Sequence, residues 1–171
     1  SAASDVYKRQ ISNSTLLEIK EKKQLVKQEQ LKKIKKTKND LKIINKMLQT
    51  DPQNLNLLLA KASMAAIIQD IETEIETLKK IIKINPITNV KSLLAQAYLR
   101  KNDGIVNEFI KKLIDEVLSE KPKDPGANFI LAKYLNQNGN KNKSRNIHLK
   151  ILKKHDDKGT VHQISKNELN I

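Results

Sequence analysis

The chain has 171 residues, a formal net charge of +14 at pH 7, 38% hydrophobic residues and only 3% aromatic residues. This length suits one domain of ordinary size, and the composition favours stacked amphipathic helices over one thick core. Four glycines and four prolines are too few for the turns of a β-sandwich, and the absence of cysteine excludes disulfides and thiolate metal sites.

The positive charge is concentrated near the N-terminus. Residues 14–50 carry eleven lysines against four acidic residues, whereas residues 51–171 carry 20 Lys and Arg against 14 acidic residues. A basic arm of this kind is typical of binding to nucleic acid, to an anionic membrane surface or to an acidic partner. Joint enrichment in Lys, Ile and Asn is also typical of an AT-rich genome, so a compositional origin stays open.

The first ten residues, SAASDVYKRQ, resemble a translated sequencing adapter. We therefore expect residues 1–10 to be a leader outside the fold, and the natural protein to begin further upstream. No stretch has the roughly 18 apolar residues that a membrane-spanning helix needs, and no signal-peptide core is visible. The compartment stays open, because a targeting segment or an anchor would lie in the missing upstream part.

Residues 11–50 are predicted to form a basic helical segment. Residues 11–38 have the pattern of a long polar helix that Ser14 or Thr15 can cap. We expect a break at Thr37-Lys38-Asn39-Asp40 and a second helix from Leu41 to Gln49. A thin apolar seam with a period close to 3.5 runs along the segment, too short to define a coiled coil.

Proline then recurs at regular intervals after apolar helix ends. Pro52, Pro86 and Pro122 are 34 and 36 residues apart, and a period in this range is the signature of a helical solenoid. Proline suits these places because it cannot continue a helix but fits the first turn of the next one. In the last unit, Asp124-Pro125 opens the helix. The predicted units cover residues 52–85, 86–121 and 122–156.

Each unit also has a break near its middle, so each is predicted to contain two helices of about four turns. The corners are Gln69-Asp70, Asp103-Gly104 and Gly139-Asn140. The second helices carry apolar residues at i, i+3, i+4 and i+7 spacing. We interpret Glu72, Glu74 and Glu76 as a solvated face, because i, i+2 spacing splits them around a helix.

These features resemble the tetratricopeptide repeat family over about residues 52–156, with residues 11–50 as a possible degenerate leading unit. Ala62, Ala95 and Ala132 match the small residue of the family's first helix. The small residue of the second helix appears only as Ser144, because Glu74 and Ile110 stand there in the other units. The resemblance implies an all-α fold, a right-handed αα-superhelix with a basic N-terminal helical extension. Another αα-repeat or an irregular helical bundle stays open.

The family resemblance also implies a non-catalytic scaffold that holds a segment of another protein in a concave groove lined by the first helices. We expect this surface to be polar and mildly basic, with Leu59 and Phe129 as apolar anchors and Lys133 or Arg100 available for a carboxylate. The expected groove residues are Asn56, Leu59, Ser63, Asn89, Ser92, Gln96, Arg100, Phe129, Lys133 and Asn136.

No catalytic, cofactor or small-molecule site is expected. The sequence has no Gly-rich phosphate loop and no Ser–His–acid or metal-ligand motif. His148, His155 and His162 are seven residues apart, but Asp156-Asp157-Lys158-Gly159 interrupts the helix that would align them. We therefore expect a packed His148 and two surface histidines rather than a metal site.

Two other functions stay open. One is an adaptor for nucleic acid or an anionic membrane through the Lys-rich segment 20–46, with salt-sensitive and sequence-independent binding. The other is the helical recognition part of a larger enzyme whose catalytic domain lies upstream. Residues 157–171 are predicted to form either a C-terminal tail or a helix that caps the last unit.

Overall fold

The computed structural model describes residues 2–154 and 160–169, and the side chains of residues 18–152 and 164–169. These described residues form helices and no strand, so the all-α prediction is confirmed. In chain order the helices are α1 (Ala2–Thr50), α2 (Leu55–Ile67), α3 (Ile71–Ile84), α4 (Thr88–Lys101), α5 (Glu108–Glu120), α6 (Pro125–Gln137), α7 (Lys141–Lys154) and α8 (Thr160–Leu169).

The N-terminal segment is one uninterrupted helix, so the predicted break at Thr37-Lys38-Asn39-Asp40 is wrong. The Thr37 hydroxyl donates to the carbonyl oxygen of Lys33 at 2.9 Å, a bond that a continuing helix accommodates. The segment also contains no glycine or proline before Pro52. Helix α1 begins at Ala2 and runs through Ser14 and Thr15, which therefore do not cap it.

Tight corners join the helices of each pair at the predicted places. Between α2 and α3, Gln69 has a φ of 62°, and the Asp70 side chain accepts a hydrogen bond from the backbone N–H of Thr73 at 3.1 Å. Gly104 has a φ of 80° between α4 and α5, and Gly139 has a φ of 77° between α6 and α7. Glycine adopts this left-handed conformation without a steric penalty, so Gly104 and Gly139 suit their two corners.

Short polar side chains cap the helices that follow the loops. Asn54 caps α2, Asn107 caps α5 and Asp124 caps α6, each through a side-chain oxygen that accepts from a backbone N–H. Helix α6 begins at Pro125, the residue directly after its cap. The predicted helix entry at Asp124-Pro125 is therefore confirmed.

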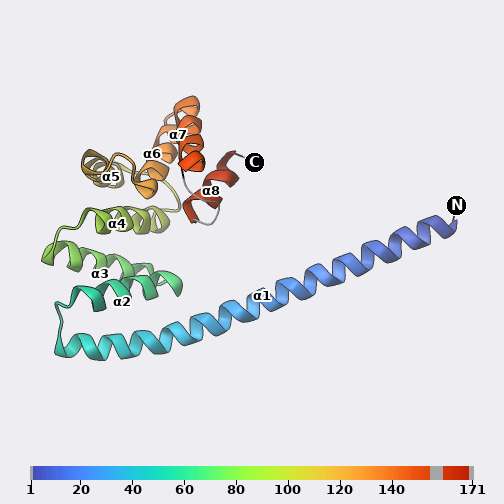
Figure 1. The fold of residues 1–171 in the computed structure, drawn as a ribbon, viewed down its shortest axis with the longest axis horizontal. Helices are drawn as coiled ribbons and strands as arrows, with labels where there is room; N and C mark the ends of the chain where they lie inside the picture. Colours follow the sequence, from blue (N-terminus) through green and yellow to red (C-terminus); the bar gives the residue numbers. More distant parts are fainter. Residues whose placement is uncertain (1, 155–159, 170–171) are drawn as a thin grey trace.

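Each helix packs on its neighbours in sequence, and α6 also contacts α4 and α8. Helix α1 packs on α2 near its C-terminal end and extends far beyond the other helices (Figure 1). Stacking of this kind, in which contacts stay close in sequence, is typical of repeat arrays.

Two apolar cores meet at α4. One core joins α2, α3 and α4, and the other joins α4, α5, α6 and α7. Tyr98 and Leu113 border both cores. The predicted small residues Ala62, Ala95 and Ala132 are all buried, so the first helices can approach their neighbours closely. Helix α4 thus connects the two halves of the molecule.

Candidate functional site

The ten expected groove residues differ widely in exposure. Asn56, Ser63, Asn89, Arg100 and Asn136 are exposed, Leu59, Gln96 and Lys133 are half-buried, and Ser92 and Phe129 are buried. Both expected apolar anchors belong to this covered group, since Phe129 is 7% exposed and Leu59 packs against the first core. The structure therefore does not bring all ten side chains to one open surface.

Ser92 and Gln96 lie where α4 contacts α6. The Ser92 hydroxyl donates to the Asp124 carboxylate at 2.8 Å, and the same carboxylate caps α6. A Cβ atom placed on Gly126 would lie 2.3 Å from Nε2 of Gln96, so only glycine permits this approach without a shift. These two expected groove residues therefore join consecutive first helices.

Arg100 is already paired with a carboxylate of the chain itself. One of its guanidinium nitrogens donates to both oxygens of Glu74 at 2.6 Å. The Glu74 side chain is only 7% exposed, so the interpretation of Glu72, Glu74 and Glu76 as a solvated face is wrong for Glu74. Burial of a carboxylate requires a partner of opposite charge, and Arg100 on α4 supplies it to α3.

The expected groove residues of the third unit lie against α8. Lys133 forms an ion pair with Glu168 of α8 at 2.8 Å, and its ammonium also lies 5.6 Å from the centre of the Phe129 ring. The Phe129 ring in turn packs edge-on against His148, with ring centres 5.8 Å apart. Both cations that we expected to hold a partner's carboxylate, Arg100 and Lys133, therefore bind carboxylates of this chain.

His148 is a packed side chain, as predicted. It is 4% exposed, and its Nδ1 lies 3.1 Å from the hydroxyl of Ser165 on α8. Burial lowers the pKa of His148 below its ordinary 6.5, while Glu168 acts in the opposite direction and Lys133 lowers it further. Neutral His148 therefore anchors α8. The side chains of His155 and His162 lie outside the described residues.

Two matching strips of residues run along α2 and α4, and six of the eight are exposed while Ala60 and Gln96 are half-buried. The α2 strip is Asn56, Ala60, Ser63 and Ile67, and the α4 strip is Asn89, Leu93, Gln96 and Arg100. Each residue of the α4 strip follows its α2 counterpart by 33 positions. Ile67 and Leu93 are 41% and 44% exposed. We did not predict these two apolar residues, although the 33-residue offset and i, i+4, i+7, i+11 spacing in the sequence point to them.

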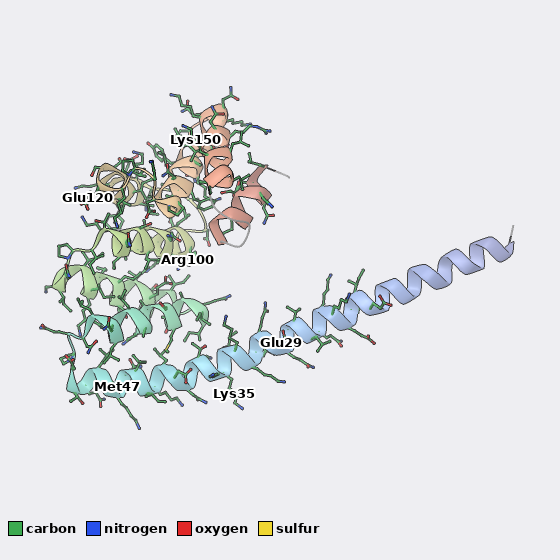
Figure 2. All side chains as sticks on the ribbon, viewed as in Figure 1. Glu29, Lys35, Met47, Arg100, Glu120 and Lys150 are labelled. Carbon is green, nitrogen blue, oxygen red and sulfur yellow. The ribbon has the colours of Figure 1, made fainter. Side chains whose placement is uncertain are left out.

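Helix α1 carries a second candidate surface. All eleven lysines between residues 20 and 46 are exposed. Several large apolar side chains are exposed beside them, among them Leu25, Leu31 and Ile43 at 59%, 57% and 58%. Figure 2 shows Lys35 on the side of α1 that points away from the other helices.

Comparison with models of protein families finds no match to this chain, and neither does a search of curated proteins. Among the described residues, none of the helices combines the length and apolar character needed to cross a membrane. Within the same part of the chain, no three His, Cys, Asp or Glu side chains cluster as metal ligands.

Proposed function

We propose that this protein is a non-catalytic scaffold of three tetratricopeptide-like helix pairs, arranged in a right-handed superhelix, that binds a segment of another protein. The binding surface in this proposal is formed by the α2 and α4 strips. The observation that carries the proposal is the equivalence of these strips, because both present an amide at the first position and the same spacing. Repeated exposed positions on consecutive units are how repeat proteins build extended binding surfaces.

The chemistry of the strips suits an extended, largely uncharged segment. The Asn56 and Asn89 side-chain amides offer donors and acceptors for a peptide backbone, and exposed Ile67 and Leu93 offer apolar contacts. Each strip covers eleven helical rises and is therefore about 16 Å long. This length equals the span of about five residues of an extended bound peptide. Arg100 is occupied by Glu74, so we do not expect recognition of a terminal carboxylate.

The third unit contributes less to this surface. Phe129 is buried, and Lys133 is paired with Glu168 of α8. Helix α8 packs on α6 and α7, in the place where the first helix of a further unit would stack. We therefore assign α8 the role of a C-terminal cap, which terminal repeats need to cover their apolar face.

A photo-crosslinking experiment tests the proposed surface. A photoreactive amino acid replaces Leu93 in one protein and Ile105 in another, because Ile105 is also exposed, at 56%, but lies in the loop before α5. After irradiation in lysate, we expect one protein to be captured through position 93 and not through position 105, and a probe at Ile67 to capture the same protein. Equal capture from positions 93 and 105 would argue against a specific surface at the strips.

A further inference from the structure

Five lysines form a row along one face of α1. Lys32, Lys35, Lys38, Lys42 and Lys46 follow one another at intervals of three or four residues, which places them on one side of a helix. We call these five residues the basic row. The row extends over 15 residues of uninterrupted helix, about 21 Å from the first lysine to the last. All five side chains are exposed.

The charge of the basic row is not neutralised within the described part of the chain. None of its lysines takes part in an ion pair there. By contrast, Lys91, Lys101 and Lys133 elsewhere in the molecule each bind a carboxylate. The only acidic residue between positions 30 and 50 is Asp40, which is half-buried. Asp40 lies three residues after Thr37 and four before Ile44, on the side of α1 that packs on α2.

The basic row lies on the opposite side of α1 from the rest of the protein. Thr37, Ile44 and Leu48 are buried or half-buried, and Leu48 packs against the core formed with α2. The row is turned by roughly 150° from this face, at 100° per residue. Lys35 accordingly points away from α2 in Figure 2. Because the contacts of α1 with the other helices lie on the opposite side, the row is free to meet a surface.

We propose that the basic row binds the surface of a membrane that contains anionic phospholipids. Five ammonium groups on long, flexible stems can reach one plane together, and lysines near an anionic membrane attract it through its negative surface potential. Leu31 lies on the same face and Ile43 borders it, and both are more than half exposed. Apolar side chains beside the cations add to the interfacial binding of a helix that lies on a membrane.

The same observations favour a membrane over nucleic acid. Residues 18–50 contain no arginine, the side chain that binds phosphate in a bidentate manner, and no aromatic residue on which a base could stack. The proposal is independent of the α2 and α4 strips, so either one can fail without the other.

Co-sedimentation with vesicles tests the proposal with the full chain. One set of vesicles contains phosphatidylserine and phosphatidylcholine, and the other contains phosphatidylcholine alone. The row variant replaces Lys32, Lys35, Lys38, Lys42 and Lys46 with Gln. The matched control replaces Lys79, Lys80, Lys83, Lys112 and Lys123 with Gln, which removes the same charge from exposed positions outside α1. Circular dichroism confirms that both variants keep their helices.

We expect the unaltered protein and the control variant to bind the phosphatidylserine vesicles with partition coefficients within about twofold of each other. The control lysines lie outside the proposed contact, and charges farther from the membrane than a Debye length of about 10 Å are screened at 0.1 M salt. We expect the row variant to bind at least about tenfold more weakly, because each lysine near the surface contributes roughly fivefold. Equal losses in the two variants, or no binding by the unaltered protein, would overturn the proposal. So would tighter, row-dependent binding to a fluorescent DNA duplex than to the vesicles.

Discussion

The guanidinium group of Arg100 binds both carboxylate oxygens of Glu74 at 2.6 Å and thereby fastens α4 to α3. The two partners differ in exposure, because the Glu74 side chain is 7% exposed and that of Arg100 is 47% exposed. The buried partner is the carboxylate, so removal of Arg100 would leave a buried negative charge without a partner. The pair joins α3 of the first helix pair to α4 of the second, and Arg100 is also the last residue of the α4 strip.

Replacement of Arg100 with Met should destabilise the protein by about 1–3 kcal/mol, because the carboxylate of Glu74 is then buried without a cation. Urea denaturation followed by circular dichroism measures this loss. The matched control is Lys101→Met, which breaks the exposed Lys101–Glu72 pair between the same two helices and should change the denaturation midpoint little. Equal losses in the two variants would mean that the burial of Glu74 has no energetic consequence.

Gly126 should be sensitive to added volume. A side chain there meets Nε2 of Gln96 at 2.3 Å and the hydroxyl of Ser92 at 2.9 Å, so Gly126→Val should destabilise the protein by about 1–3 kcal/mol through overpacking. Because the nearest atom is the end of a flexible side chain, Gln96→Ala in the same protein should restore part of the loss. Thermal denaturation of the two variants measures both effects. The close contact between α4 and α6 would be refuted if Gly126→Val were as stable as the unaltered protein.

His148 should make the stability depend on pH. Its pKa is lowered in the folded protein, mainly by burial, so the unfolded chain binds a proton at a higher pH than the folded chain does. The stability that neutral His148 contributes is therefore fully present above pH 6.5, the ordinary pKa of histidine. This contribution is lost as the pH falls from 6.5 through the lowered pKa of the folded protein. Chemical denaturation at a series of pH values from 6.5 downward measures this loss of stability.

The variant His148→Gln isolates this contribution. Glutamine can still hydrogen-bond to Ser165 but does not titrate, so the variant should lose less stability than the unaltered protein over the same pH range. Hydrogen exchange at residues 164–169 should show the same difference, because Ser165 lies on α8 and contacts His148. If both proteins respond to pH identically, protonation of His148 does not loosen α8.

The corners within the three helix pairs and the entry of α6 could be predicted because they depend on local chemistry. The starts of α2 and α4 differ from the prediction, since Leu55 and Thr88 follow Pro52 and Pro86 by three and two residues and neither proline lies in the first turn. Pro125 after Asp124 starts α6, and Gly104 and Gly139 adopt the positive φ that ends a helix. The break predicted at Thr37-Lys38-Asn39-Asp40 failed for a local reason too. Polar residues of this kind can begin a helix, but without glycine or proline they can also continue one, and the Thr37 hydroxyl bonds to the preceding turn.

The candidate surface was harder to predict because exposure depends on which helices meet. The spacing of Phe129 and Lys133 places them on one face of α6, but α8 lies against that face. Glu168 of α8 binds Lys133, and Ser165 of α8 contacts His148 of α7. Likewise, no local pattern shows that Glu74 meets Arg100, which is 26 residues away. Periodicity therefore identified the helices, and the contacts between distant residues decided which of their side chains remain accessible.

The continuity of α1 leads to a prediction about distances. Spin labels at Lys22 and Asn45, both exposed, should give one narrow distance distribution, because 23 residues of uninterrupted helix span about 34 Å. The variant Asn39→Pro should broaden and shorten this distribution, since proline in a helix interior removes a hydrogen bond and kinks the chain. Double electron–electron resonance measures both proteins. A broad distribution in the unaltered chain would show that α1 is not one rigid helix.

The most direct test of the scaffold proposal is the affinity of the purified protein for the segment captured by crosslinking, measured by isothermal titration calorimetry. The decisive variant is Ile67→Ser with Leu93→Ser, which removes the exposed apolar side chains of both strips. Its control is Ile84→Ser with Ile105→Ser, two exposed side chains outside the strips. The proposal predicts that the strip variant binds at least about tenfold more weakly, as two lost apolar contacts imply, and that the control binds normally. Unchanged affinity in the strip variant would contradict it.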